Sequence, residues 1–65
     1  MTKFQSFYEN VRIGDANAIR DAIEANVSQV TFLNWKRGKF EPDSRWWGVI
    51  NDIAEKFGYE KPYTL

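Results

Sequence analysis

Residues 27–39, VSQVTFLNWKRGK, have the signals of a short helix with two marked ends. Ser28 is typical of a helix N-cap, because its hydroxyl can accept a hydrogen bond from a backbone N–H two or three residues on. Gly38 is typical of a helix end, because glycine enters the left-handed conformation without a steric penalty. We therefore predict a helix near residues 29–37. This helix constrains the fold more than any other segment does, since the rest of the chain must cover one of its faces.

The two faces of this helix differ in chemistry. Phe32 and Trp35 are three residues apart, so they share a face and are expected to anchor the helix in the core. The opposite side carries Gln29, Val30, Leu33, Asn34 and Arg37. A monomer without a partner would favour Glu or Lys at positions 30 and 33. We therefore expect a partner to cover Val30 and Leu33, with packing of Leu33 on a fourth helix or on the tail as the alternative.

A first helix is predicted near residues 3–12. Thr2 and Gln5 have the spacing of a capping box, in which hydroxyl and amide satisfy each other's backbone donors. Apolar residues then follow at the i, i+3, i+4, i+7 spacing of one helix face. They are Phe4, Phe7, Tyr8 and Val11. Gly14 is expected to end this helix.

A second helix is predicted near residues 16–25, with Asp15 as its cap. Its inward stripe is formed by Ile19, Ala22 and Ile23. Asn26 tolerates positive φ better than most residues, so it is expected to end the helix. The short connection from there to Ser28 predicts a helix-turn-helix corner.

A fourth helix is predicted near residues 44–57, after a loop that contains proline. Asp43 or Ser44 is the expected cap, and Gly58 the expected end. Its apolar face consists of Trp47, Ile50, Ile53, Ala54 and Phe57, with Trp46 on the edge. The tail carries two tyrosines and Leu65, which either pack back on the domain or meet a second copy of the chain.

The composition excludes several classes of function. The 65 residues include no cysteine and no histidine, so thiolate ligands, the commonest general base and the commonest neutral metal ligand are missing. The four glycines are scattered and form no phosphate loop. No apolar run approaches the roughly 18 residues of a membrane span, and no signal peptide opens the chain. We predict one all-α, compact four-helix domain over residues 1–65, in the cytoplasm. No enzyme activity, cofactor, metal, small-molecule substrate or membrane is expected.

A net charge of zero counts against a general binder of polyanions, but the distribution of the charges softens this argument. Residues 27–48 carry four cations and two acids, a local charge of +2. A helix in the major groove reads bases mainly from its N-terminal residues, while cations nearby hold phosphate. Amides pair with adenine and aliphatic groups contact thymine methyls. Base contacts are therefore expected from Gln29, Val30, Thr31, Leu33 and Asn34, and backbone contacts from Lys36, Arg37, Lys39 and Arg45.

Double-stranded DNA is thus the expected partner, bound weakly by one subunit. About four phosphate contacts give a log–log salt slope near −3.6, because each contributes roughly −0.9. Dimerisation is the usual remedy, with half-sites about 34–36 Å apart. A homodimer is therefore considered as well.

The run SQVTFLNWKRGK followed by FEP resembles the recognition-helix region of the Cro and phage-repressor helix-turn-helix family. That family typically has a Ser-Gln start, an aromatic residue or Leu before the final turn, Gly-Lys and a nearby proline. The resemblance is close over residues 27–42 and loose over residues 19–57. It implies a sequence-specific transcriptional regulator, such as a repressor, of phage or mobile-element type. It places Gln29, Val30 and Asn34 at base-contacting positions. It also places Ser28 at the cap and Asn17 near the start of the second helix, which touches phosphate, so Asn17 and Ser28 are expected to contact the DNA backbone as well.

Two residues depart from the pattern of that family. Asp21 stands where the family has an apolar residue, so the second helix is expected to be rotated or offset. Lys36 stands where a frequent Glu pairs with a first-helix Arg, so Arg12 is expected to lack that partner.

A helical protein-interaction module is the alternative function. The net charge of zero and several apolar side chains motivate it. They are Val30 and Leu33 on the third helix, Trp46 and Trp47 on the fourth, and Tyr59 and Tyr63 in the tail. A further variant is binding of RNA or single-stranded DNA through the tryptophans.

Overall fold

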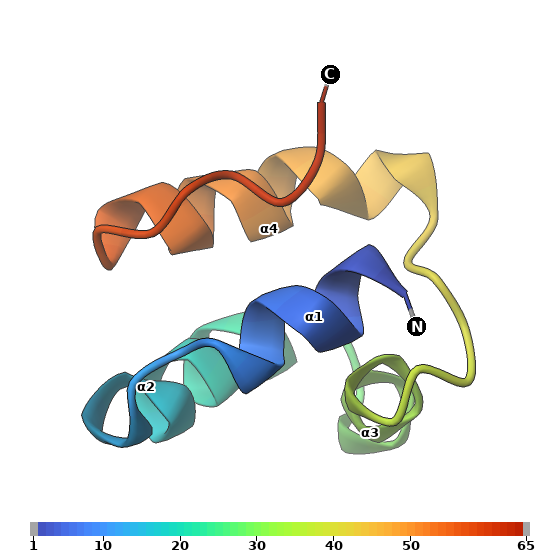
Figure 1. Ribbon diagram of the computed structural model, residues 1–65. Coiled ribbons are helices and arrows are strands. Elements are labelled where there is room, and N and C mark those ends of the chain that lie inside the picture. Colours follow the sequence, from blue (N-terminus) through green and yellow to red (C-terminus); the bar gives the residue numbers. More distant parts are fainter. Residues whose placement is uncertain (1, 65) are drawn as a thin grey trace.

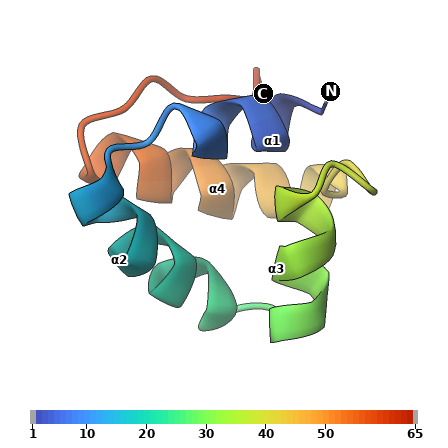
Figure 2. The same cartoon turned by 60° about the horizontal axis from the view of Figure 1, so that its bottom comes forward.

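Four helices account for most of the chain in a computed structural model that describes residues 2–64 (Figure 1). They are α1 (Lys3–Glu9), α2 (Ile13–Glu24), α3 (Gln29–Lys36) and α4 (Ser44–Lys56). Figure 2 shows α2 and α3 as the arms of a V joined by a short turn, with α4 behind them and α1 across the open end. The extents of 24 × 24 × 23 Å make the shape nearly isotropic. The predicted all-α fold with four helices is confirmed.

The boundary between α1 and α2 lies earlier in the chain than predicted. Helix α1 stops at residue 9 instead of 12, and α2 starts at residue 13 instead of 16. Gly14, expected to end α1, lies in the first turn of α2. Asp15, expected to cap α2, lies in the same turn and accepts a hydrogen bond from the Tyr59 hydroxyl at 2.6 Å. Both predictions are wrong: Gly14 is part of α2, and the Asp15 carboxylate is held by Tyr59 in the tail instead of capping the helix.

Arg12 also contacts Asp15 and Tyr59, at the corner between α1, α2 and the tail. It precedes α2, and its guanidinium Nε donates to Asp15 Oδ2 at 2.9 Å. The same guanidinium lies 4.8 Å from the centre of the Tyr59 ring. Arg12 therefore has partners on α2 and in the tail, in place of the Glu on α3 that the family resemblance would have supplied.

The two ends of α3 largely follow the prediction. Ser28 Oγ accepts a hydrogen bond from the backbone N–H of Thr31 at 3.1 Å, which confirms the cap. Gly38 and Gly58 have φ of +76° and +84°, so the glycine stops after α3 and α4 are confirmed as well. Each helix ends one residue earlier than predicted, α3 at residue 36 and α4 at residue 56.

Two other predicted caps are wrong or incomplete. No residue other than glycine has positive φ between residues 2 and 64, so Asn26 does not end α2 in the expected way. The chain instead leaves α2 through Ala25, at φ −68° and ψ −17°. Asp43 occupies the N-cap position of α4, but its side chain makes no capping hydrogen bond with the described residues. Its carboxylate lies 3.6 Å from the Arg45 guanidinium.

Gln5 links α1 to the end of α3. Thr2 Oγ1 accepts from the Gln5 backbone N–H at 3.0 Å, which is the first half of the predicted capping box. The second half is wrong, because Gln5 Nε2 donates to the Arg37 carbonyl at 3.3 Å instead. A Cβ at Gly38 would overlap with Gln5 Oε1. The positive φ of Gly38 therefore favours glycine, and a Cβ there would also shift the end of the Gln5 side chain.

The core is aromatic and includes the inner face of α3. Its fully or almost fully buried apolar residues are Phe4, Ile19, Ile23, Phe32, Trp35, Ile50, Ala54 and Tyr63. The ring of Phe4 has its centre 6.1 Å from that of Phe32 and 5.7 Å from that of Trp35. The predicted anchoring of α3 by Phe32 and Trp35 is confirmed.

The tail packs back on the domain, as one of the two predictions stated. Figure 1 shows it running back along α4. The Tyr63 ring stacks on Trp47, with centres 4.9 Å apart. Asn51, buried on α4, accepts from the Tyr63 N–H at 3.1 Å and donates to its carbonyl at 2.9 Å. The Tyr63 hydroxyl donates to Glu41 at 2.6 Å. Leu65, named in the same prediction, lies outside the described residues.

Candidate nucleic-acid interface

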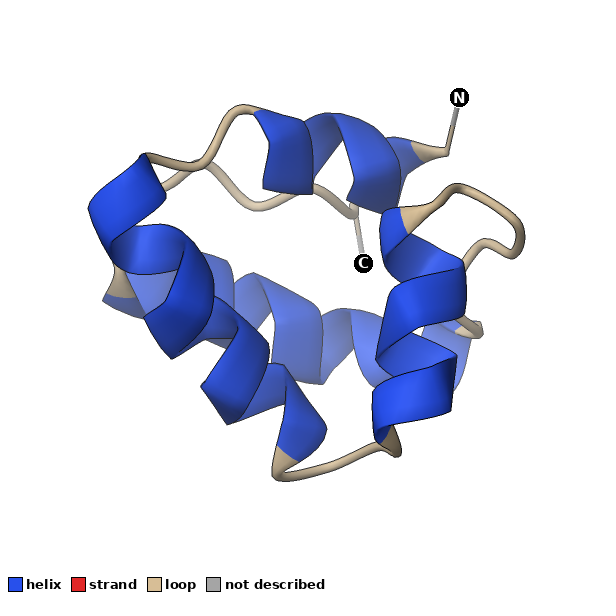
Figure 3. Ribbon diagram, turned by 90° about the horizontal axis from the view of Figure 1, so that it is seen from below, coloured by secondary structure: helices blue, strands red, loops and turns tan. Residues whose placement is uncertain are grey.

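The outer side of α3 faces away from the core. Successive residues of a helix are about 100° apart, so the buried Phe32 and Trp35 place Val30 on the opposite side. The Val30 side chain is 68% exposed. Figure 3 shows α3 at one edge of the molecule, with a side clear of the other helices. This side is the part of α3 that a partner can approach.

Four of the predicted base-contacting residues lie on or beside this outer side. Gln29 and Val30 are exposed, whereas Leu33 and Asn34 are half-buried. Leu33 lies outside the hydrophobic core cluster that the described residues form. Together these four side chains offer two amides and two aliphatic groups.

Thr31 is turned toward α4, away from the other predicted base contacts. It is half-buried, and its hydroxyl lies 2.9 Å from Ser28 Oγ. It also lines a recess of about 290 Å³ together with Trp35 and Trp46. Both Thr31 and Ser28 therefore have hydroxyls engaged in the first turn of α3.

Three of the predicted backbone-contacting residues form a cationic group at the end of α3. Lys36, Arg37 and Lys39 are exposed, and none forms an ion pair with another residue in the range 2–64. Lys36 Nζ lies 5.8 Å from the centre of the Tyr8 ring on α1. Burial raises the pKa of Tyr8, so this ring stays neutral beneath the ammonium group. These three residues, the α3-end cations, keep their charge available to a partner.

Of the other three predicted backbone contacts, Ser28 caps α3, and two lie away from this group. Arg45 lies in the first turn of α4, 3.6 Å from Asp43 and with its guanidinium 5.6 Å from the Trp46 ring centre. Asn17 is exposed on α2. Neither belongs to the outer side of α3.

The charge around α3 differs from that of the flanking helices. No acidic residue occurs between Glu24 and Glu41. On α2, by contrast, Arg20 lies 3.6 Å from Asp21 and 3.9 Å from Glu24. Helix α3 and the residues beside it therefore present positive charge without acidic partners, whereas the cation on α2 has two.

Sequence reasoning missed one exposed residue of this region. Phe40 is 54% exposed, and Lys39 Nζ lies 5.5 Å from the centre of its ring. The available signal was an aromatic residue in the short loop between Gly38 and Pro42. Phe40 extends the candidate interface beyond the end of α3.

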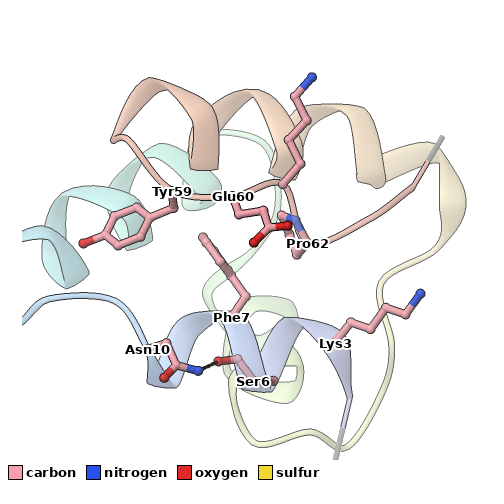
Figure 4. Close-up of a pocket in the computed structure, with 8 residues that line it drawn as sticks. Lys3, Ser6, Phe7, Asn10, Tyr59, Glu60 and Pro62 are labelled. Atoms are coloured by element: carbon pink, nitrogen blue, oxygen red, sulfur yellow. Dashed lines mark hydrogen bonds between the residues drawn. The ribbon is translucent and has the colours of Figure 1, made fainter.

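A second surface feature is a groove of about 440 Å³ between α1 and the tail (Figure 4). Phe7 points from α1 toward the tail, between Tyr59 and Glu60 (Figure 4). Lys3 and Lys61 also line it, so acidic and basic groups are mixed.

Residues 2–64 contain no group of three or more side chains that could hold a metal ion. No helix within the same range is long and apolar enough to cross a bilayer.

Comparisons with protein-family models, curated proteins and solved structures give no match for this chain. The function must therefore be inferred from the residues of the α3 region.

Proposed function

We propose that the chain is a sequence-specific double-stranded DNA-binding protein, not an enzyme, with α3 in the major groove. It would act in the cytoplasm as a transcriptional regulator of phage or mobile-element type. One observation carries the proposal: the exposed outer side of α3 ends in three cations that have no acidic partner within residues 2–64.

The dimensions of α3 fit this role. Its eight residues make a helix about 12 Å long, at roughly 1.5 Å per residue. The major groove of B-DNA is about 12 Å wide and admits one helix. The amides of Gln29 and Asn34 are the groups that pair bidentately with adenine. The resemblance of residues 27–42 to the Cro and phage-repressor family supports the same arrangement.

The small number of cations predicts modest affinity for one subunit. Three phosphate contacts give a log–log salt slope of about −2.7, and a fourth from Arg45 gives about −3.6. A homodimer that binds two half-sites would raise the affinity, and sedimentation with and without duplex DNA would detect it.

The α3-end cations provide the main test. The variant with Lys36, Arg37 and Lys39 all changed to Gln should fold normally and bind duplex DNA with a salt slope smaller by about 2.7. The matched control changes Lys3, Lys56 and Lys61 to Gln, which removes three charges elsewhere. Fluorescence anisotropy between 50 and 200 mM salt measures both slopes, and circular dichroism checks the fold. Failure of the unmodified protein to prefer any duplex at low salt would exclude the proposal.

A protein-interaction module is the second candidate, and the 68% exposure of Val30 favours it. The tryptophans contribute less than the sequence suggested, because Trp46 and Trp47 pack on the core cluster. This packing also weakens the case for single-stranded or RNA binding through them. If Leu33→Glu disrupts a protein assembly while the α3-end cations are dispensable, the interaction module is correct.

A further inference from the structure

We infer that the outer side of α3 reads thymine methyl groups, so that the preferred duplex contains two thymines one or two base-pair steps apart. The inference rests on the proposed function and names the DNA that the α3 site selects.

Val30 and Leu33 form an aliphatic pair on α3. Val30 is 68% exposed and Leu33 is half-buried outside the core cluster of the described residues. Neither position contributes to the core, and a charged residue at either one would be better hydrated. Aliphatic side chains at such positions stabilise a complex only when a partner covers them with apolar groups.

The partner surface that fits this pair is the major groove of DNA. In the major groove, the C5 methyl of thymine is the apolar group that distinguishes one base from the others. The acid-free segment from residue 25 to residue 40 and the α3-end cations are complementary in charge to a phosphate backbone. An apolar pocket on a protein partner would fit Val30 and Leu33 equally well, but it would leave these cations without a function.

The spacing of Val30 and Leu33 also fits the spacing of base pairs. Residues three apart on a helix have Cβ atoms roughly 5–6 Å apart. Base pairs rise by about 3.4 Å per step, so two steps span about 6.8 Å. Val30 and Leu33 therefore match two methyl groups that are one or two steps apart.

The experiment begins with selection of a preferred site from random duplexes. Each thymine of that site is then replaced by uracil, which removes the C5 methyl and keeps the pairing edges. Burial of one methyl-sized group corresponds to about a fourfold change in affinity. We expect fourfold losses at two positions one or two steps apart, and about a 15-fold loss when both are replaced. Uracil in the flanking sequence should have no effect.

Variants of the protein assign the contacts. Val30→Ala should abolish the uracil effect at one of the two positions, and Leu33→Ala the effect at the other. Ile13→Ala is the matched control, because Ile13 is 93% exposed on α2 and lies outside the proposed interface. It should leave both uracil effects unchanged.

The possible outcomes separate this inference from the proposed function. A preferred duplex whose affinity is the same with uracil at every position overturns the methyl readout and leaves DNA binding intact. Uracil effects that persist unchanged in both alanine variants also overturn it, because other residues then contact the methyls. If no duplex is preferred at any salt concentration, the proposed function and this inference both fail.

Discussion

The tail side of the molecule and the outer side of α3 use their polar side chains in opposite ways. On the tail side, Asn51 and Glu41 both form hydrogen bonds to Tyr63. Asp15 is held in the same manner by Tyr59 and Arg12. These groups connect parts of the chain that are far apart in sequence, and they hold the fold together.

On the outer side of α3, the polar groups are left for a partner. Gln29 is exposed, and the α3-end cations form no ion pair with residues 2–64. A side chain that is already hydrogen-bonded within the fold must break that bond before it can recognise a partner. The difference indicates which side of the molecule stabilises the domain and which side is available for binding.

The largest expected effect distinguishes the inner from the outer face of α3. Trp35→Ala should lower the free energy of unfolding by about 3–5 kcal/mol, because Trp35 is only 5% exposed and packs in the aromatic core. Val30→Ala, on the exposed face, should change it by less than about 0.5 kcal/mol. Urea denaturation followed by circular dichroism compares them. Equal stability of the two variants would mean that the faces of α3 are assigned incorrectly.

The next effect tests the tail side directly. Asn51→Ala should cost about 2 kcal/mol, because it removes two hydrogen bonds to the backbone of Tyr63 in a buried position. Asn34→Ala serves as its counterpart on α3 and should leave stability within about 0.5 kcal/mol of the original. Denaturant midpoints provide the measurement. A larger loss for Asn34→Ala than for Asn51→Ala would reverse the comparison.

Two glycines should respond with opposite signs. Gly38→Ala should destabilise the domain by about 1–2 kcal/mol, because its φ is +76° and a Cβ would displace Gln5. Gly48→Ala lies inside α4 with nothing within 4 Å of the new Cβ, so it should stabilise by roughly 0.5–1 kcal/mol. Thermal melts of both variants would check the signs. A stabilised Gly38→Ala would show that the helix end tolerates ordinary side chains.

The smallest effect concerns pH and the corner between α2 and the tail. The hydroxyl of Tyr59 and the guanidinium of Arg12 lower the pKa of Asp15 below its usual value. A lowered folded pKa stabilises the fold at pH values above the unfolded pKa of about 3.9, and that stability is lost as the pH falls through the folded pKa. The stability difference between the original protein and Asp15→Asn should therefore shrink below about pH 4. A difference that stays constant from pH 2 to 7 would contradict this assignment.

The sequence predicted α3 well because its signals are local. Ser28 and Gly38 mark its ends, and the spacing of Phe32 and Trp35 identifies its inner face. The outer side follows by elimination, which is why four of the predicted base-contacting residues lie on or beside it. Thr31 lies beside the buried face, about 100° from Phe32 around the helix, and lines a recess with Trp46 of α4.

The α1–α2 corner could not be predicted from local signals. Gly14 and Asp15 have the typical order of a helix stop and a cap, yet the partner of Asp15 is Tyr59, 44 residues away. Asn51 presents the same difficulty, because a polar residue beside an apolar helix face acquires its role only when Tyr63 packs against it. Each case depends on the position of the tail, and local sequence patterns do not specify that position.

The length of α3 has a consequence for how it meets a partner. Isolated helices shorter than about 12–15 residues are marginal in water, and α3 has eight residues. It is held instead by Phe32, Trp35 and the bond from Gln5 to the Arg37 carbonyl. Its hydrogen-bonded amide protons, from Phe32 onward, should therefore exchange with solvent more slowly than those of Gln29 and Val30. The helix is formed before any ligand arrives, so association does not spend free energy on ordering its backbone.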